Sequence, residues 1–426
     1  MTLTRRNLLL MPAAGLPRIF AQRRADVLYD EAKVPAYTLP DVLKTKDGRT
    51  IRTAKEWQAQ RRYILGLYEN LVYGRAPGKP RNLAFHLDSV DSAALGGKAV
   101  RKLITVSFVK QPSAPRMRLL LYLPAYPGKP APVFAGLAFG GIHTIADDPG
   151  VPLAEEWVRD PATKQMVKSV APESSRGRNA GLWQVEQILS HGYGLAVAYY
   201  GDIEPDFDGG WKYGVRPLFF KPGQTAPDPN AWCAIAEWAW GLRRIMDYLV
   251  TDRDVDAERV AAFGHSRLGK AALWAGAQDT RFSIVISNES GEGGAAISRR
   301  DFGERTEDLN AHFPHWFCAN YRQFDHHEEK MPFDAHFLLA LVAPRSLYVA
   351  SAEGDQWSDP KGEFLAAYHA SPVWALFGKK GIPTDQMPPV EHPIMYDVAY
   401  HVRTGKHNVT AYDWEQYLKF AAMHWS

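Results

Sequence analysis

A serine in a glycine-flanked turn is the residue of this chain best placed to do chemistry. Residues 264–270 read G-H-S-R-L-G-K, after a strand-like run over 259–263 and before a helix-like run. This strand–turn–helix pattern predicts a nucleophile elbow, whose strained backbone exposes the Ser266 hydroxyl at the sheet edge. The second glycine comes one place later than in G-x-S-x-G, because Arg267 and Leu268 both precede it. A guanidinium beside the nucleophile indicates a site that handles negative charge.

A serine hydroxyl needs a base to take its proton and an acid to hold that base. In this fold class the chain order is serine, acid, histidine, so both partners are expected after the elbow. His407 is the best base candidate, because it lies in a turn-like segment near the C-terminus. Rivals by position alone are His392, His401 and His424. His265 is expected to pack or to orient the turn, since neighbouring elbow side chains diverge.

Two carboxylates compete for the role of the acid. Glu289 lies in a Gly-rich segment directly after the strand predicted at 283–287, and Asp355 lies just past the strand predicted at 344–350. Polar loops after strands are typical of an active-site rim. The residues alone leave the choice open, and a solvated loop carboxylate is the plain alternative for either.

The oxyanion hole is expected to use the backbone N–H of Arg267 and a second donor. Residues 139–143, F-G-G-I-H, follow a buried strand predicted at 133–139 and are similar to the Gly-rich loop that supplies this donor in esterases. An ordinary glycine turn is the alternative. The Arg267 side chain is a further candidate donor.

Neither a metal site nor a cofactor site is predicted. The sequence has no H-E-x-x-H motif and no paired cysteines. The pairs His326-His327 and Glu328-Glu329 lie in a polar stretch, where adjacent histidines rarely share a metal. The glycines at 291–294 lack the helix and ribose-binding acid of a dinucleotide site.

Alternating apolar strands and helices predict the scaffold that positions these residues. Strands are expected at 99–108, 117–123, 133–139, 193–200, 259–263, 283–287 and 344–350, and helices at 54–73, 182–191, 231–249 and after the elbow. This order predicts a mostly parallel sheet with helices on both faces. The polar stretch 150–178 is expected to be an irregular loop insertion near the top of the sheet.

The bulk composition is that of a large globular enzyme. The 426 residues are 46% apolar, and 50 basic and 47 acidic residues give a net charge of +3. Without a long basic run, nucleic acid is not an expected partner. Both cysteines, Cys233 and Cys318, are expected to be small buried hydrophobes, with a single disulfide between them left open.

The first 21 residues have the features of an export signal. The pair Arg5-Arg6 precedes an apolar stretch over 8–16, and a small-residue cleavage site precedes Gln22. The apolar stretch is shorter than the roughly 20 residues that span a bilayer. The pattern predicts a twin-arginine signal, with an ordinary secretory signal as the alternative. The mature chain, 22–426, is expected to be one catalytic domain that works in the periplasm or outside the cell.

Several motifs in order resemble the glucuronoyl esterases. The 264–270 segment is similar to their G-C-S-R-x-G-K elbow, which is the most specific match. The further matches are E-S-G-x-G-G at 289–294, P-F-D-A-H at 332–336, L-V-A-P-R at 341–345, D-Q-W at 355–357, and His407. The resemblance covers most of the chain from the first sheet strands onward.

This resemblance implies an α/β-hydrolase three-layer sandwich and gives roles to individual residues. Ser266 would be the nucleophile, Glu289 the triad acid and His407 the base. Asp355 would be an auxiliary or alternative partner of the base, and Arg267 would stabilise the oxyanion. Sugar-contacting residues would be Lys270, Glu304 and Trp357.

The sequence departs from the fungal pattern at two places. Fungal members have a cysteine before the nucleophile and another after the catalytic histidine, joined as a disulfide. Here these positions are His265 and Asn408, so the loop that carries His407 is expected to be held by packing. The 150–178 segment looks like an insertion of the bacterial type, which would deepen the cleft.

The implied activity is hydrolysis of (4-O-methyl)glucuronic acid esters, as in the bonds that join glucuronoxylan to lignin alcohols. The implied enzyme is an exported monomer without a cofactor, membrane attachment or nucleic-acid partner. An acetyl or feruloyl esterase is the first alternative, and it would have no special use for Lys270 and Trp357. A carbohydrate-binding protein with a decayed triad is the second, against which the intact triad residues argue. An exported peptidase has only the fold in its favour.

Overall fold

The structure is a computed structural model that describes residues 27–125 and 128–425. The export signal predicted over residues 1–21 lies outside the described residues. Within the described ranges, no helix is long and apolar enough to cross a membrane.

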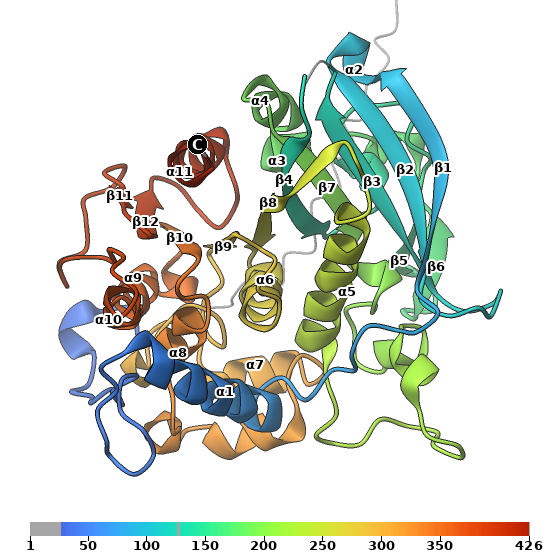
Figure 1. The fold of residues 1–426 in the computed structure, drawn as a ribbon. Coiled ribbons are helices and arrows are strands. Elements are labelled where there is room, and N and C mark those ends of the chain that lie inside the picture. Colours follow the sequence, from blue (N-terminus) through green and yellow to red (C-terminus); the bar gives the residue numbers. More distant parts are fainter. Residues whose placement is uncertain (1–26, 126–127, 426) are drawn as a thin grey trace, which may run out of the picture.

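Ten strands form one twisted sheet through the centre of the molecule (Figure 1), in the order β1-β2-β3-β7-β4-β8-β9-β10-β12-β11. The bounds are β1 Ala84–Ala93, β2 Ala99–Ser107, β3 Arg116–Pro124, β4 Ala131–Ala138, β7 Gly194–Tyr199, β8 Val255–His265, β9 Ile284–Asn288, β10 Ser346–Ala352, β11 Ile394–Met395 and β12 Val398–Arg403. Strands β7, β4, β8, β9, β10 and β12 are parallel. Their carboxyl ends therefore meet at one edge of the sheet, where loops from several strands can build a site.

Helices cover both faces of this sheet (Figure 1). Their bounds are α1 Ala54–Leu71, α2 Ala94–Gly97, α3 Ala180–Trp183, α4 Val185–Ser190, α5 Ala234–Leu249, α6 Arg267–Gln278, α7 Thr306–His312, α8 Ala335–Ala340, α9 Pro360–Ala370, α10 Pro372–Ala375 and α11 Ala411–His424. Helices α1, α5, α6 and α8 pack on one face, and α4 and α11 on the other. This is the α/β-hydrolase architecture that the sequence predicts.

The alternation of strand side chains divides the apolar interior into two cores. In β4, Val133 and Ala135 belong to the core under α5 and α6, whereas Phe134 belongs to the core under α11. Successive side chains of a strand point to opposite faces, so a strand that is apolar throughout must be covered on both sides. The continuous apolar runs in the sequence are explained by this double burial.

Local signals fix where the helices begin. Thr53 accepts a hydrogen bond from the Glu56 backbone N–H at the start of α1. At the start of α11, Thr410 and Asp413 form a capping box. Such caps satisfy N–H groups that the first helical turn leaves without partners. The α11 cap also defines the end of the loop that carries His407.

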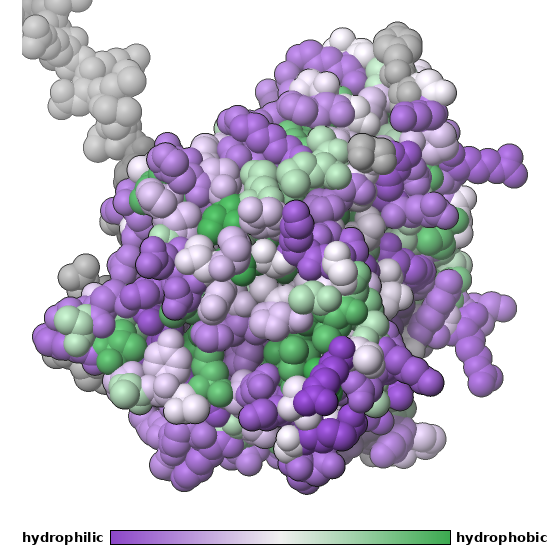
Figure 2. All heavy atoms as spheres, turned by 60° about the vertical axis from the view of Figure 1, so that its left-hand side comes forward, coloured by the Kyte–Doolittle hydropathy of each residue, from purple (hydrophilic) through white to green (hydrophobic). Residues whose placement is uncertain are grey.

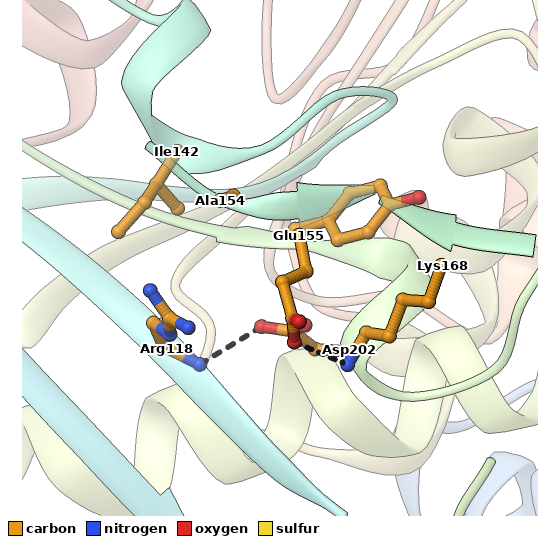
Figure 3. Close-up of a pocket in the computed structure, with 7 residues that line it drawn as sticks. Arg118, Ile142, Ala154, Glu155, Lys168 and Asp202 are labelled. Atoms are coloured by element: carbon orange, nitrogen blue, oxygen red, sulfur yellow. Dashed lines mark hydrogen bonds and ion pairs between the residues drawn. The ribbon is translucent and has the colours of Figure 1, made fainter. Parts of the chain in front are cut away.

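The 150–178 insertion is more regular than the sequence suggests, because it contains the antiparallel hairpin of β5 (Glu155–Arg159) and β6 (Met166–Val170). A small pocket lies at its base (Figure 3), where Glu155 and Lys168 form an ion pair of 3.5 Å. The Arg118 backbone N–H donates to Asp202 in the same pocket. The prediction of an irregular loop is therefore wrong for residues 155–170, where polar and apolar side chains mix without a regular alternation that would predict paired strands.

Other elements differ from the sequence prediction in detail. The helix expected at 182–191 is broken at Gln184, which has a φ of 43°. The edge strands β1 and β11 and the strand β12 were not predicted. Cys233 and Cys318 are buried and both are free, which rules out the disulfide left open above. Figure 2 shows a largely hydrophilic face on which apolar side chains form separate small patches.

Candidate active site

The turn at Ser266 has the geometry of a nucleophile elbow. Ser266 stands between β8 and α6 with φ 57° and ψ −132°, a strained conformation for a residue with a side chain. A Cβ at Gly264 would lie 1.9 Å from the Leu268 carbonyl oxygen, and one at Gly269 would lie 3.0 Å from the Ser290 Cβ. Gly264 therefore cannot carry a side chain without a shift of the backbone, and Gly269 packs tightly against the loop after β9.

Three loops bring the acid and base candidates to the same edge of the sheet. Glu289 follows β9, Asp355 follows β10 and His407 follows β12. The His407 Nδ1 lies 2.6 Å from the Asp355 Oδ2 and 3.1 Å from the Glu289 Oε2. The structure therefore places both acid candidates on one nitrogen of one histidine.

Burial and charge shift the pKa values of this group in different directions. Burial alone would lower the pKa of His407, but its interactions with Asp355 and Glu289 outweigh burial and raise it. Burial raises the pKa of Glu289, against the effect of His407. At Asp355 burial raises the pKa, but the hydrogen bond from His407, the charge of His407 and the hydrogen bond from Ser358 together outweigh burial, and the pKa is lowered. Asp355 is thus the carboxylate that stays ionised most readily beside the base.

Glu289 has further partners that Asp355 does not share. Its Oε1 accepts a 2.6 Å bond from Arg403, and its Oε2 accepts a 2.9 Å bond from the Asn408 backbone N–H. The Glu289 carboxylate therefore ties the loop that carries His407 to the end of β9. The sequence analysis predicts that packing holds this loop, but a hydrogen bond to Glu289 holds it as well.

Arg267 is fixed beside the elbow by a carboxylate and by aromatic rings. Its guanidinium pairs with Asp206, which also accepts from His315 Nε2 at 2.8 Å and Trp316 Nε1 at 2.7 Å. The Arg267 Cζ lies 4.6 Å from the centre of the Trp316 ring and 5.8 Å from that of Phe139. As the first residue of α6, Arg267 also has a backbone N–H without an intrahelical acceptor. One residue thus offers two kinds of donor near Ser266.

The Gly-rich loop after β4 does not offer the Gly141 N–H to a substrate. That N–H donates a 2.6 Å hydrogen bond to Glu156 Oε1, and Arg178 pairs with the same carboxylate. Glu156 lies in β5, so this loop is bound to the insertion hairpin. The Gly141 N–H is therefore not free to act as the second oxyanion donor, and the expectation that the loop over 139–143 supplies that donor stays a prediction for its other N–H groups. No local pattern predicts the contact between Glu156 and Gly141, because Glu156 lies in a segment without a recognisable motif.

The three residues assigned to sugar contact lie together. The Trp357 Nε1 donates to Glu304 Oε1 at 3.0 Å, and the Lys270 Nζ lies 3.7 Å from Glu304 Oε2. Burial raises the pKa of Glu304 and lowers that of Lys270. Lys270 is on α6, four residues after Ser266. A cation, an acceptor and an indole are thus grouped one helical turn from the elbow.

Comparisons with known proteins bear directly on this arrangement. A family model described as fungal glucuronyl esterase matches residues 228–378. A solved glucuronoyl esterase from Solibacter usitatus is 63% identical, with a TM-score of 0.89, and the match covers 93% of this chain and 100% of that one. This chain belongs to the glucuronoyl esterase family.

Other relatives place it among the bacterial members of that family. A carbohydrate esterase from an unknown prokaryotic organism is 46% identical over 96% of this chain and 94% of its own length. A solved structure described as a promiscuous CE15 esterase from a marine bacterial metagenome is also 46% identical, with a TM-score of 0.86 and coverage of 93% of this chain and 100% of that one. The 4-O-methyl-glucuronoyl methylesterase of Schizophyllum commune is 26% identical over 80% of this chain and 74% of its own.

The rival histidines of this glucuronoyl esterase family member have other partners. His401 is buried, with Nε2 2.9 Å from Asp413 and Nδ1 2.8 Å from the Tyr348 hydroxyl. His392 and His424 bond to backbone carbonyls. His265 holds the Asn288 side chain at 2.6 Å, and its ring lies 4.5 Å from that of His407, so it orients the turn as expected.

Sequence reasoning missed several polar residues that support this site in the esterase. They are Asp206, Glu363 and Arg403. Glu363 is fully buried and accepts from the Ser290 and Gly291 backbone N–H groups at 2.8 and 3.0 Å, and from Ser351 Oγ at 2.6 Å. None of the three lies in a motif, and only their three-dimensional contacts identify them.

Proposed function

We propose that this chain is a serine esterase that hydrolyses esters of (4-O-methyl)glucuronic acid, as in bonds between glucuronoxylan and lignin alcohols. The observation that carries the proposal is the group Lys270, Glu304 and Trp357 beside the elbow. A buried ammonium and a carboxylate can donate to and accept from sugar hydroxyls, and an indole offers a flat surface. A plain acetyl esterase has no use for such a group.

In the proposed first step, Ser266 Oγ attacks the C6 carbonyl of the uronate ester while its proton passes to His407. The carboxylates of Asp355 and Glu289 stabilise the imidazolium that forms. The backbone N–H and the guanidinium of Arg267 stabilise the developing oxyanion. The tetrahedral intermediate collapses when His407 gives its proton to the leaving alcohol, and a glucuronoyl ester of Ser266 remains.

In the proposed second step, water repeats the attack on that ester. His407 takes a proton from the water, the second tetrahedral intermediate forms, and the proton returns to Ser266 Oγ as the acyl bond breaks. The products are free uronate and the resting enzyme. Asp355 is assigned the main orienting role because its bond to His407 is the shorter of the two and because Glu289 is also bound to Arg403 and Asn408.

We also propose where the enzyme works and what its oligomeric state is. The Arg5-Arg6 pair and the apolar stretch after it support export to the periplasm or the medium. A polymeric plant substrate is consistent with that location. We propose that the enzyme works there as a monomer.

Lys270→Met tests the substrate assignment. The benzyl ester of glucuronic acid and an aryl acetate are compared as substrates, with Lys419→Met as the matched control on an exposed helix face. The variant should lose about 10- to 100-fold in kcat/KM for the uronate ester, which is the size expected for a lost hydrogen bond to a charged group. Aryl acetate hydrolysis should change by less than about threefold. Equal losses on both substrates would contradict the assignment of Lys270 to the sugar.

A broader ester specificity is the second candidate, because the 46% identical marine relative is described as promiscuous. It predicts similar kcat/KM values for the uronate ester and simple acetates, and no selective effect of Lys270→Met.

A further inference from the structure

Arg403, the last residue of β12, has every nitrogen of its buried guanidinium engaged. Its Nε donates to Asp413 Oδ2 at 2.7 Å, and its Nη1 donates to the Thr404 carbonyl at 2.8 Å. Its Nη2 donates to Glu289 Oε1 at 2.6 Å and also faces the carbonyls of Lys406 and Asn408. The side chain is 3% exposed, so these contacts are shielded from water.

These partners belong to three different elements. Glu289 follows β9, residues 404–408 form the loop that carries His407, and Asp413 caps α11. The two carbonyls that Nη2 faces, those of Lys406 and Asn408, flank His407 in the chain. A single planar cation therefore sets where the backbone of this loop lies relative to one of the two carboxylates of the base.

We propose that Arg403 is a positioning residue that fixes the position of His407 relative to Glu289. It therefore affects kcat rather than substrate binding. This inference rests on the proposed function only in taking His407 as the base. The residue touches neither substrate nor reacting atoms, and it acts through the loop and the carboxylate.

The chemistry of the side chain explains why arginine is needed here. A guanidinium has five N–H donors in a fixed fork, so it can serve two carboxylates and the loop carbonyls at once. A lysine at this position has three donors on one atom and cannot reach partners on opposite sides. The fungal pattern links the positions of His265 and Asn408 covalently, and here the Asn408 backbone is bound by Arg403 and Glu289 instead.

Removal of the cation also has a consequence for pH dependence. Burial already raises the pKa of Glu289, and the positive charge of Arg403 opposes that rise. The charged or titratable groups that face Glu289 include His407, His265, Asp355, Arg403, Glu363, Tyr400 and Tyr417. Without Arg403 the Glu289 carboxyl binds its proton more tightly, and the nearby His407 imidazolium no longer faces a like charge. Both groups therefore keep their protons to higher pH, so the acidic limb of the activity profile moves to higher pH.

The test compares Arg403→Met and Arg403→Lys with Arg345→Met in the full mature chain. Arg345 is partly buried and donates to the carbonyls of Gly276 and Phe282, but it precedes β10 and so lies at the opposite end of the sheet from the site. Rates are measured on both the benzyl uronate ester and an aryl acetate across pH, together with melting temperatures. If the wild type cleaves only the acetate, the uronate assignment fails while Arg403 is still tested on the same triad.

Arg403→Met should lower kcat by about 100-fold or more with KM within about threefold, because only transition-state geometry is lost. The acidic limb of its pH–rate profile should move to higher pH by about one unit. Arg403→Lys keeps the positive charge and is more readily folded than Arg403→Met. It should restore the acidic limb of the pH–rate profile to its wild-type position but should not restore the full kcat. Arg345→Met should lose melting temperature without either kinetic change. A kcat loss no greater than that of Arg345→Met, an unmoved limb, or a change confined to KM would overturn the proposal.

Discussion

At the scale of single residues, the site is organised around one imidazole nitrogen. The His407 Nδ1 faces Asp355 at 2.6 Å and Glu289 at 3.1 Å, so a positive charge on this ring lies beside two carboxylates. Two acids on one base raise its pKa, and this makes the site a stronger proton acceptor than an isolated histidine. The ionised form of the base is more stable in consequence, so activity should develop at higher pH than an ordinary histidine would give.

Asp355→Asn should shift the acidic limb of kcat/KM to lower pH. One carboxylate that stabilises the imidazolium is removed, so the pKa of His407 falls towards its ordinary value. The rate at the optimum should drop by about 10²- to 10⁴-fold, since the loss of a triad acid is of this order. Measurement of kcat/KM from pH 5 to 10 checks both effects. If the acidic limb of kcat/KM does not move in Asp355→Asn and the rate at the optimum falls only slightly, the orienting role belongs to Glu289 instead.

The guanidinium of Arg267 is kept in place by Asp206, which two neighbouring rings also hold. Asp206→Asn keeps the size of the side chain but removes the charge that fixes this cation. We expect kcat to fall about 10- to 100-fold through a misplaced oxyanion donor, with KM nearly unchanged. Steady-state kinetics on the aryl acetate is the readout, and a rise in KM alone would show that Asp206 serves substrate binding.

At the scale of elements, parallel strands explain why residues so distant in sequence meet. Strands β9, β10 and β12 are neighbours in the order β9-β10-β12, and the loop after each one carries a residue of the site. Glu363, at the start of α9, links two of these loops because it accepts from Ser290, Gly291 and Ser351. The site therefore depends on a buried carboxyl that no substrate is expected to touch.

Glu363→Gln should reduce the pH dependence of stability. Burial raises the pKa of Glu363 to about 8, whereas an unfolded glutamate titrates at about 4.3. Stability from the protonated carboxyl is thus complete below pH 4.3 and is lost as pH rises through about 8. Glutamine resembles the neutral acid, so the fall in melting temperature between pH 5 and pH 9 should be smaller in the variant. The exposed Glu415→Gln is the control, and an unchanged fall in Glu363→Gln would refute this account.

Much of the scaffold is predictable from the sequence, because most of the buried parallel strands consist of continuous runs of apolar residues. The strands at β4, β7, β8, β9 and β10 and the elbow all follow that signal. The hairpin β5–β6 and the edge strand β1 do not, since they mix polar with apolar side chains, many of them exposed. The strand β12 carries His401 and Arg403, and β11 has only two residues, so neither forms a continuous apolar run. The contacts of Arg403, Asp206 and Glu156 are tertiary contacts of residues that lie in no motif, so no local pattern reveals them.

At the scale of the whole molecule, the insertion hairpin contacts loops at the edge of the sheet where the candidate active site lies. Glu156 in β5 binds the Gly141 N–H, and Trp157 packs on Tyr213 at a ring distance of 4.7 Å. Phe207, which follows Asp206 in the chain, completes this aromatic group. The hairpin thus supports the loop beside Arg267 and adds exposed ring surface to the same side.

Replacement of the hairpin tip, residues 159–166, by a short glycine–asparagine turn should separate small from large substrates. Glu156 and its bonds are kept, so aryl acetate hydrolysis should stay within about threefold. Release of uronate from a polymeric glucuronoxylan ester should fall about tenfold, because we expect the insertion to deepen the cleft that binds the polymer. Parallel assays on the two substrates decide the matter, and equal activity on the polymer would mean that the hairpin has no part in binding it.

The most direct test of the account is hydrolysis of the benzyl ester of glucuronic acid, compared with acetylated xylan and an aryl acetate, by the mature protein and by Ser266→Ala. We expect a clear preference for the uronate ester, and we expect its hydrolysis to fall by three or more orders of magnitude in Ser266→Ala. Hydrolysis of acetates without the uronate ester would contradict the proposed substrate, and full activity in Ser266→Ala would contradict the proposed nucleophile.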